Sequence, residues 1–574
     1  MRCLALALTV LGLLLPIGLA ASANAAPLVP DSSFSGDGRA TIAVADYNLA
    51  ALAVAIAPDG KIVVAGEGTS RTGSPADWAI AVARFLPDGT PDPSFGADGL
   101  VVTQTSTLGG PPLARKSGAT GVVVLPDRRI VIAGYTTSPE GFSFRADLQV
   151  VRYTESGELD TTFGEGDGMA IAPFTERAYG IGLALGPGGT LVTVGQLQAD
   201  GSSTGWGVAR FTAAGVPDAT FSGDGVDVVD VHPNEYETVE AVAVQQDGSI
   251  VAAGWSLMDE SDHDPVVVLT RHDTHGALDP QFDADGRAII DGIADAAAFA
   301  VAIQPDGKIV VGGFASSNSM VVRLTAGGAL DTAFGTGGVT TTGPALGRIE
   351  GLAIGAGGTI FTGGWTHKGP MLGASDMFAG RVLPGGQADG VFSFAFGTSA
   401  DAYAIAIQGD GRPVLAGRSY DGNAALRTDF GVMRLVEGSD SGSGGSSPTG
   451  PGTTTTSPCV SVNACPQPPL PSLTALPAFT QLVKLPSTKK CVSRRKFSIR
   501  LRVPTRSKVV EAVVKVNGKR VAVRRGNRLR STVDLRSLPK GRFRVQVVLK
   551  LADGRKIRDT RRYRTCTPKR RRAR

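Results

Sequence analysis

The chain repeats a unit of about sixty residues seven times, and this period constrains the fold more than any other feature. Each unit begins with a turn that contains a phenylalanine, such as PDPSFGADG at 91–99 and LDTTFGEGDG at 159–168. A hairpin such as APDGKIVVAG at 57–66 or QPDGKIVVGG at 304–313 follows. The seven phenylalanines are Phe34, Phe95, Phe163, Phe221, Phe282, Phe334 and Phe392. The last strand of each unit ends in an arginine, at Arg84, Arg152, Arg210, Arg271, Arg323, Arg381 and Arg434.

The apolar runs within a unit are short and β-branched, and Asp-Gly or Gly-Gly turns divide them. This pattern predicts antiparallel strands rather than helices. In the first unit we expect four strands, at 39–46, 51–56, 61–65 and 77–85. A four-stranded sheet cannot bury both of its faces alone, so seven sheets are expected to close a ring. The predicted fold is all-β, with a seven-bladed β-propeller at 26–436, a flexible Ser/Gly/Thr/Pro-rich linker at 437–488 and a small β-sandwich at 489–574.

The two ends of the propeller are expected to close it. The last strand of the seventh unit, which ends near Arg434, is not followed by the Leu-Asp-x-x-Phe turn of the other units. The N-terminus carries the equivalent segment, PDSSF at 30–34. We therefore expect this segment to dock beside the seventh blade.

The motifs LDxxFGxxG and QxDGKIVVAG, with the arginine-terminated strand, resemble the bacterial delta-60 repeat β-propeller family across residues 30–436. The resemblance implies the propeller fold and a secreted or surface protein. It supplies no catalytic residues, because that family is mostly without an assigned activity.

The first 25 residues predict a signal peptide. Arg2 gives a positive start, an apolar run covers 4–20, and ANA at 23–25 is a small-x-small cleavage site. No later segment is long and apolar enough to cross a bilayer. We therefore expect an exported, soluble protein that is extracellular, either secreted or associated with the cell envelope.

Four cysteines remain after the signal peptide, which predicts two disulfides out of three possible pairings in an oxidising compartment. Cys491 and Cys566 bracket the strands of the C-terminal domain, so we expect them to form its clasp. Cys459 would then pair with Cys465 in the linker. Zinc is the competing interpretation, but no histidine lies in this part of the chain.

The C-terminal domain alternates apolar and polar residues. Phe543, Val545, Val547 and Leu549 are expected to share one face of a strand, and Asn517-Gly518 predicts a hairpin. The pattern resembles a compact immunoglobulin-like β-sandwich.

Charge divides the chain into a basic and an acidic part. Residues 484–574 hold 33 Lys and Arg against four acidic residues, a net charge of +29, so the remainder carries −24 and the whole chain +5. Such asymmetry favours contact with a polyanion, and we expect an anionic cell-wall polymer or extracellular glycan. Docking on the acidic propeller and a merely solvated surface remain open, whereas nucleic acid is disfavoured because few aromatics could stack on bases. The expected contact residues are Arg500, Arg502, Arg544, Lys550, Arg570, Arg571 and Arg572.

Ligand binding by the propeller is expected where the units differ from each other. The uniform turns share one rim, so the variable connections lie on the opposite rim, where loops on a rigid scaffold commonly bind ligands. The residue after each Ala-Gly or Gly-Gly is aromatic in four units, at Tyr135, Trp255, Phe314 and Trp365. These rings are candidates for binding sugar or peptide faces. Alternatively, they cap the outer edges of the blades.

An extracellular polysaccharide lyase or hydrolase with its site at the channel mouth is the alternative function. First-strand carboxylates such as Asp46, Asp227, Asp230 and Asp291 could line the channel. A cluster of two or more carboxylates or histidines at the channel mouth would favour the enzyme. The five histidines are His232, His263, His272, His275 and His367. His272 and His275 could suggest a metal, but we expect both in a surface turn, and no catalytic residue is assigned.

No cofactor or metal site is predicted. Asp283 and Asp285, or Asp98, resemble parts of a calcium loop, but the full spacing that ends in glutamate is missing. Asp-Gly also suits any tight turn, so calcium stays open. The sequence thus predicts an exported, non-catalytic binding or scaffold protein, and it defines neither the ligand nor the oligomeric state.

Overall fold

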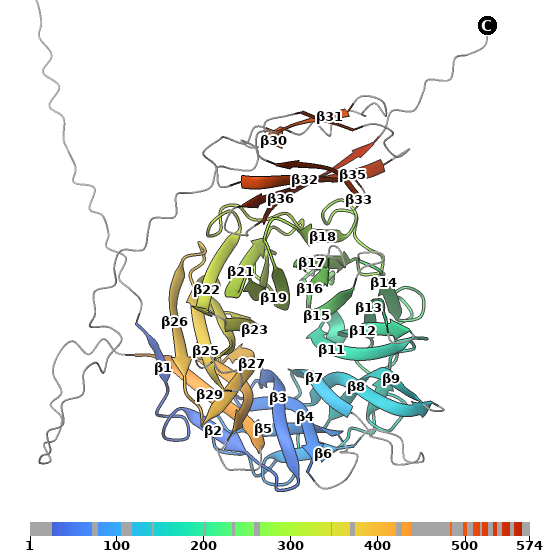
Figure 1. Ribbon diagram of the computed structural model, residues 1–574. Coiled ribbons are helices and arrows are strands. Elements are labelled where there is room, and N and C mark those ends of the chain that lie inside the picture. The colour runs from blue at the N-terminus through green and yellow to red at the C-terminus, as the bar shows by residue number, and fades with distance from the viewer. Residues whose placement is uncertain are drawn as a thin grey trace, which may run out of the picture.

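The computed structural model describes residues 26–438 except 72–77, 105–116, 141–142, 200–201, 232–235, 258–263, 346, 368–373 and 421–426, and beyond them only strand segments between 483 and 564. Apart from two single-turn 3-10 helices, η1 (Pro187–Gly189) and η2 (Ala356–Gly358), the regular elements of these residues are strands. Residues 28–437 form seven sheets around a central axis (Figure 1). The predicted all-β, seven-bladed propeller is confirmed.

Each blade has four strands, named here from the axis outwards. The innermost strands are β3 (Tyr47–Ile56), β7 (Ser117–Val124), β11 (Arg177–Leu185), β15 (Glu237–Val244), β19 (Ala296–Ile303), β23 (Gly347–Ile354) and β27 (Ser399–Ile407). The second strands are β4 (Ile62–Ser70), β8 (Ile130–Glu140), β12 (Leu191–Ala199), β16 (Ile250–Leu257), β20 (Ile309–Ala315), β24 (Ile360–His367) and β28 (Pro413–Tyr420). The third strands are β5 (Trp78–Phe85), β9 (Ser143–Tyr153), β13 (Ser202–Phe211), β17 (Pro265–His272), β21 (Asn318–Leu324), β25 (Ser375–Val382) and β29 (Thr428–Glu437). The outermost strands are β6 (Leu100–Thr103), β10 (Met169–Ile171), β14 (Val226–Val229), β18 (Arg287–Ile290), β22 (Val339–Ala345), β26 (Ala388–Phe394) and, in the seventh blade, β2 (Arg39–Ile42) with β1 (Leu28–Pro30).

The sequence unit and the blade are out of phase by one strand. The strand that opens a unit pairs with the last strand of the unit before it, as β6 does with β5. It therefore forms the outer edge of the preceding blade. The strand that faces the axis is the second of the unit, and in the first unit it begins at Tyr47, earlier than the expected 51–56.

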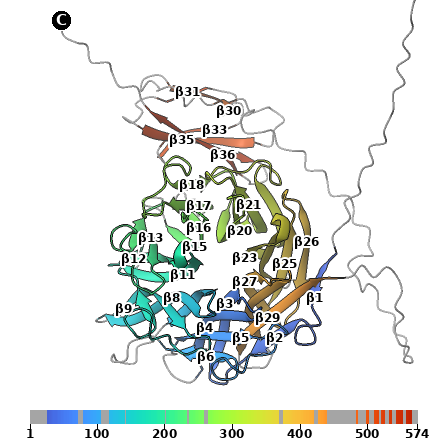
Figure 2. The same ribbon diagram turned by 180° about the vertical axis from the view of Figure 1, so that it is seen from behind.

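The ring closes through the N-terminal segment. Both β1 and β2 pair antiparallel with β29, and Figure 2 shows them beside it. Asp31 follows β1 and accepts a hydrogen bond from Arg434 Nε at 2.8 Å. The predicted docking of 30–34 on the seventh blade is confirmed.

The arginine near the end of each third strand fastens its blade to a neighbour. Arg84 Nε donates to Asp92 Oδ2 at 2.7 Å, the guanidinium lies 4.7 Å from the Phe95 ring centroid, and Nη1 donates to the Glu155 carbonyl of the next blade. Six further arginines likewise pair with an aspartate and donate to a carbonyl outside their own hairpin, namely Arg152, Arg210, Arg271, Arg323, Arg381 and Arg434. The repeated arginine, aspartate and phenylalanine of the sequence are thus an interblade latch.

The hydrophobic core lies between neighbouring blades rather than at one centre. One cluster joins Val63 and Val82 of the first blade to Ile132 and Val151 of the second, all fully buried. Another joins Leu49 of the first blade to Val432 of the seventh, across the closure. Each sheet therefore buries its two faces against two different neighbours, as a stacked ring requires.

The described C-terminal strands form two sheets. One contains β30 (Val483–Lys484), β31 (Phe497–Leu501) and β34 (Thr532–Leu535), and the other contains β32 (Val509–Val516), β33 (Lys519–Arg525), β35 (Arg542–Leu551) and β36 (Lys556–Arg564). Val545, Val547 and Leu549 are fully buried, which confirms the predicted apolar face for these three. The pairing of β32 with β33 from Val516 and Lys519 onwards agrees with the predicted hairpin.

Several predictions concern residues outside the described part of the chain. These are the signal peptide, nearly all of the linker, Arg502, Arg570, Arg571, Arg572 and the four cysteines Cys459, Cys465, Cys491 and Cys566. Of the other predicted basic contacts, Arg500 lies in β31 and Arg544 and Lys550 lie in β35.

Candidate ligand site at the mouth of the propeller channel

Every innermost strand carries one β-bulge at the same place. In β15, for example, the register with β16 shifts between Val239 and Ala241, so Glu240 is the extra residue. The seven bulged residues are Leu52, Thr120, Ile181, Glu240, Phe299, Glu350 and Tyr403. All seven line the central channel, which has a volume of about 350 Å³. A bulge re-aims a side chain, and here each blade contributes one such residue to the channel wall.

The glycine in each IVVAG-like hairpin makes the bulge possible. A Cβ at Gly254 would lie 2.0 Å from the Thr238 carbonyl oxygen, and one at Gly364 would lie 2.0 Å from the Arg348 carbonyl oxygen. Both carbonyls belong to the inner strand just before the bulge. Because no side chain fits there, the repeated glycine allows the bulge, and the bulge places a residue that varies between blades in the channel.

The channel wall is chemically asymmetric. The first three blades contribute Leu52, Thr120 and Ile181, which carry no charge. The remaining blades contribute Glu240, Phe299, Glu350 and Tyr403, two carboxylates alternating with two aromatic rings. A ligand entering the channel would therefore meet ionisable and aromatic groups on one side only.

Two glutamates are held in the same way, two blades apart. The indole Nε1 of Trp255 donates to Glu240 Oε1 at 3.0 Å, and that of Trp365 donates to Glu350 Oε1 at 2.9 Å. Each tryptophan lies on the second strand of its blade, directly beside the bulge. The indole fixes the position of one carboxylate oxygen and stabilises its charged form.

Arg348 connects the two glutamates. Its Nε lies 2.6 Å from Glu350 Oε1, and its guanidinium carbon lies 3.5 Å from the ring centroid of Phe299, the bulged residue of the intervening blade. The positive charge of Arg348 also acts on Glu240, where it favours the carboxylate. One cation of the sixth blade thus contacts Glu350 and favours the charged form of Glu240.

Burial controls the protonation of both glutamates. It raises the pKa of Glu240 to about 7, although the indole of Trp255 and the charge of Arg348 oppose the rise. Burial also raises the pKa of Glu350, whose side chain is 11% exposed, and the ion pair with Arg348 again opposes it. The negative charge of Glu350 also raises the pKa of Glu240 by repulsion. Perturbed carboxylates of this kind are typical of functional sites.

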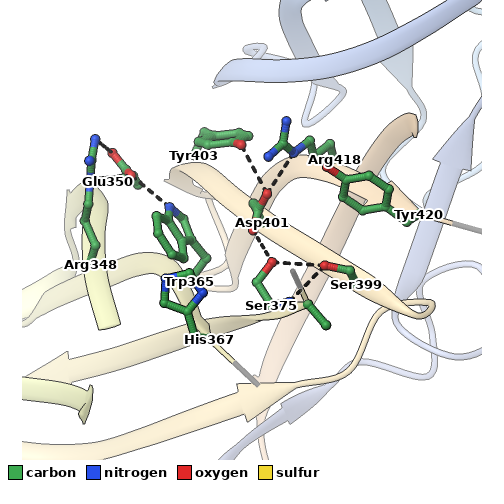
Figure 3. Close-up of a pocket in the computed structure, with 11 residues that line it drawn as sticks. Arg348, Glu350, Trp365, His367, Ser375, Ser399, Asp401, Tyr403, Arg418 and Tyr420 are labelled. Carbon is green, nitrogen blue, oxygen red and sulfur yellow. Dashed lines mark hydrogen bonds and ion pairs between the residues drawn. The ribbon is translucent and has the colours of Figure 1, made fainter. Parts of the chain in front are cut away.

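A pocket of about 360 Å³ lies between the sixth and seventh blades, and Glu350 is one of its lining residues (Figure 3). Glu350, Trp365 and His367 form its wall on the sixth blade, with the Trp365 and His367 rings edge to face at 5.0 Å between centroids. Tyr403 and Tyr420 form the wall on the seventh. The volume is within the usual range for small-molecule sites.

Asp401 organises the seventh-blade wall. It accepts hydrogen bonds from Arg418 Nε at 2.7 Å, from the Tyr403 hydroxyl at 3.2 Å and from the Ser375 hydroxyl. The guanidinium also lies 5.4 Å from the Tyr420 ring centroid. Asp401 is therefore a positioning residue, because its oxygens are engaged in holding Arg418, Tyr403 and Ser375.

The predicted rim aromatics lie near the channel rather than on the outer edges of the blades. Trp365 lines the pocket, and Trp255 holds Glu240. Phe314 stacks on Phe299 with 5.8 Å between centroids, and Tyr135 lies 5.8 Å from the Tyr179 ring of the next inner strand. All four occupy second strands, each paired with the innermost strand of its blade, so the alternative of outer-edge caps is wrong. Ligand binding by these four residues stays a prediction.

The predicted first-strand carboxylates do not line the channel. Asp227 lies on the outermost strand β14, while Asp230 and Asp291 follow outermost strands. Asp46 lies in the exposed turn that leads from outermost β2 to β3. The prediction fails because the first strand of each unit completes the preceding blade. The channel carboxylates Glu240 and Glu350 come instead from innermost strands, each of which is the second strand of its sequence unit.

The histidines do not form a metal site among the described residues. His272 is fully buried at the end of β17, with Nε2 3.0 Å from Asp227 Oδ2, so the predicted surface turn is wrong for this residue. His275 is exposed in the following turn, as expected. His232 and His263 lie outside the described part. Within that part, no group of three or more His, Cys, Asp or Glu is placed to hold a metal ion.

Sequence reasoning missed Glu240, Glu350 and Arg348 because it looked for differences in the loops. The detectable signal lay in the second strand of each unit, where aligned copies read LAVAI, TGVVV, IGLAL, EAVAV, FAVAI, EGLAI and YAIAI. One column of these small and apolar strands holds two glutamates. A charged residue at that position is costly to bury, and this marks it as a functional candidate.

Four stretches of the chain match the profile of a family described as "Domain of unknown function (DUF5122) beta-propeller", at residues 57–95, 125–163, 187–221 and 304–334. These stretches carry the hairpin and the phenylalanine turn of four units, and they support a β-propeller family. A comparison with curated proteins finds no match.

Solved structures similar to this chain include a gluconolactonase from Xanthomonas campestris, with 13% identity, 56% of this chain and 89% of that chain covered, and a TM-score of 0.29. An α-L-arabinanase from Penicillium chrysogenum complexed with arabinobiose has 11% identity, coverage of 71% and 97%, and a TM-score of 0.33. A Hadza microbial sialidase has 11% identity, coverage of 62% and 73%, and a TM-score of 0.34.

No helix in the described part of the chain has the length and hydropathy needed to span a bilayer.

Proposed function

We propose that the mouth of the propeller channel binds an uncharged saccharide. The observation that carries this proposal is the pocket between the sixth and seventh blades, where aromatic faces and paired polar groups line one cavity. Trp365 and Tyr420 offer flat apolar surfaces to the C–H faces of a sugar ring. Arg418 and Glu350 offer hydrogen-bond donors and acceptors to its hydroxyl groups.

The charge of the pocket favours a neutral ligand. Arg348 is paired with Glu350, and Arg418 is paired with Asp401 at 2.7 Å, so two cations and two anions cancel. A uronic acid would compete with these carboxylates for the guanidinium groups, whereas a hydroxyl can hydrogen-bond to a guanidinium that keeps its counter-ion. We therefore expect neutral oligosaccharides to bind better than acidic ones.

Binding by the full-length protein to an array of neutral and uronic-acid-containing oligosaccharides tests the proposal. Calorimetry on the neutral ligands that bind should show a loss of roughly tenfold or more in affinity for Trp365→Ala, because a buried aromatic anchor is worth more than about 1 kcal/mol. Arg418→Ala should weaken binding similarly. Arg71→Ala, an exposed arginine on the same rim, is the matched control and should bind like the wild type. Absence of neutral glycan binding would refute the proposal.

A second proposal concerns the basic C-terminal region and the site of action. Its charge of +29 supports contact with an anionic cell-envelope polymer after export of the mature chain. Retention of the full-length protein on isolated anionic wall polymer should fall steeply between low salt and 0.5 M salt, because screening weakens exposed charge pairs. Replacement of Arg544 and Lys550 with glutamine should reduce the retention. Salt-insensitive retention, or none, would contradict this proposal.

A further inference from the structure

We propose that Glu240 and Glu350 act together as proton donor and proton acceptor, so that the saccharide held at the channel mouth is hydrolysed at a glycosidic bond. This inference rests on the saccharide site proposed above, and it adds a reaction to that site.

Both acids line the channel that adjoins the saccharide pocket. Glu240 and Glu350 occupy the same bulge position of the fourth and sixth blades and line the same channel. Phe299 of the fifth blade lies between them in the ring of bulged residues, and Glu350 also lines the pocket between the sixth and seventh blades. A sugar chain that extends from the pocket into the channel therefore passes Glu350 and reaches Glu240.

The two carboxyl groups have different environments. Glu350 is ion-paired with Arg348 at 2.6 Å, which opposes the rise in the Glu350 pKa that burial causes. Glu240 accepts hydrogen bonds from Trp255 and Thr238, and the charges that act on it are those of Arg348 and Glu350. Burial raises the pKa of Glu240 to about 7, so a substantial fraction carries a proton at neutral pH. A pair of carboxyls in unlike surroundings is the pattern that separates an acid from a base.

The reaction balances with water as the only co-reactant. Glu240 donates its proton to the glycosidic oxygen as the bond from that oxygen to the anomeric carbon breaks. The oxygen of a water molecule forms a bond to the anomeric carbon, and Glu350 accepts the proton that this water releases. The products are two shorter saccharides, each with a new hydroxyl group at the cleaved position. Before the next turnover Glu350 releases its proton to solvent and Glu240 takes one up from solvent.

The test uses the full-length protein with 4-nitrophenyl glycosides of neutral pentoses and hexoses in both anomers, together with the corresponding unmodified oligosaccharides. Glu350→Gln should lower kcat at least a hundredfold on every cleaved substrate. Glu240→Gln should lower kcat by a similar factor on oligosaccharides but much less on nitrophenyl glycosides, because nitrophenolate leaves without protonation. Glu158→Gln, an exposed glutamate on the opposite rim, should retain wild-type rates. For the wild type, kcat/KM should fall above about pH 7 on oligosaccharides.

The outcomes separate this inference from the binding proposal. Binding of oligosaccharides without cleavage overturns the hydrolytic inference and leaves the saccharide site intact. Cleavage that persists at the wild-type rate in both glutamine variants also overturns it. A failure to bind any member of the panel overturns the saccharide site and the hydrolysis with it.

Discussion

Asp31 and Arg434 form a buried ion pair at 2.8 Å across 403 residues of sequence. The same arginine donates through Nη2 to Ser33 at 2.9 Å and through Nη1 to the Pro87 carbonyl of the first blade. One side chain therefore joins the seventh blade, the N-terminal segment and the first blade. In the other six blades the equivalent aspartate lies eight residues after its arginine, so this is the latch whose aspartate comes from the opposite end of the chain.

Asp31→Asn should destabilise the propeller by about 3 to 5 kcal/mol, because removal of one partner leaves a buried charge without compensation. The Asp31 and Arg434 side chains are 7% and 5% exposed, which justifies this range. The unfolding midpoint in urea measures the effect. Asp37→Asn is the control, since the Asp37 side chain paired with Arg39 is 60% exposed, and its loss should cost under about 1 kcal/mol. Equal effects of the two variants would show that the closure latch adds nothing.

Gly157→Ala should destabilise the protein more than Gly223→Ala. The two glycines have φ of +91° and +93°, so alanine meets the same backbone strain at both. A Cβ at Gly157 would lie 2.9 Å from the Phe95 ring, whereas nothing lies within 4 Å of a Cβ at Gly223. We expect a cost above about 1 kcal/mol at Gly223 and a clearly larger one at Gly157. Comparable melting temperatures for the two variants would mean that the Phe95 ring is not packed tightly against Gly157 of the second blade.

The propeller could be predicted from sequence because its determinants repeat. Phe95, Asp92 and Arg84 belong to one motif that recurs in every unit. This repetition allowed the number of blades and the closure of the ring to be predicted. The channel residues were hidden by two physical effects. The blade is offset by one strand from the repeat, which moved Asp227 to the outer edge. A bulge then breaks the two-residue alternation of β15, so the face that Glu240 occupies does not follow from counting.

Acid should weaken the interblade latches before it affects the strands. Burial alone would raise the pKa of Asp92, but hydrogen bonds from Ser94 and Lys61 and the charge of Arg84 outweigh it and hold that pKa well below its usual range. The pKa of Asp160 is lowered in the same way. Because the unfolded carboxylates bind protons first, the stabilisation is complete above about pH 5 and is lost as pH falls through and below the unfolded pKa near 4.

Urea unfolding at pH 7, 5, 4 and 3 measures this loss. The contribution of the latch, measured as the gap between the wild type and Asp92→Asn, should be constant between pH 7 and 5, and the wild-type midpoint should fall below pH 5. Asp92→Asn should be less stable than the wild type at pH 7, and the difference should shrink at pH 3, where the wild-type latch is itself weakened. A gap between the two proteins that is independent of pH would contradict the linkage.

Glu240→Gln and Glu350→Gln should both stabilise the protein at high pH, because burial raises the pKa of both acids. Burial raises the pKa of Glu240 from 4.5 to about 7, so the folded state binds the proton more tightly than the unfolded state. Stability is therefore lost as pH rises from 4.5 towards 7, by at most about 3 kcal/mol. Glutamine keeps the oxygen that accepts the Trp255 indole and removes the charge. Glu240→Gln should thus raise the melting temperature at pH 8 and have little effect at pH 4.5. Burial also raises the pKa of Glu350, so Glu350→Gln should likewise raise the melting temperature at pH 8. The Arg348 side chain that it leaves unpaired is 37% exposed, so the loss of the ion pair should cost little. If Glu240→Gln lowered the melting temperature at pH 8, the folded protein would have to compensate the charge of the Glu240 carboxylate, which contradicts the prediction.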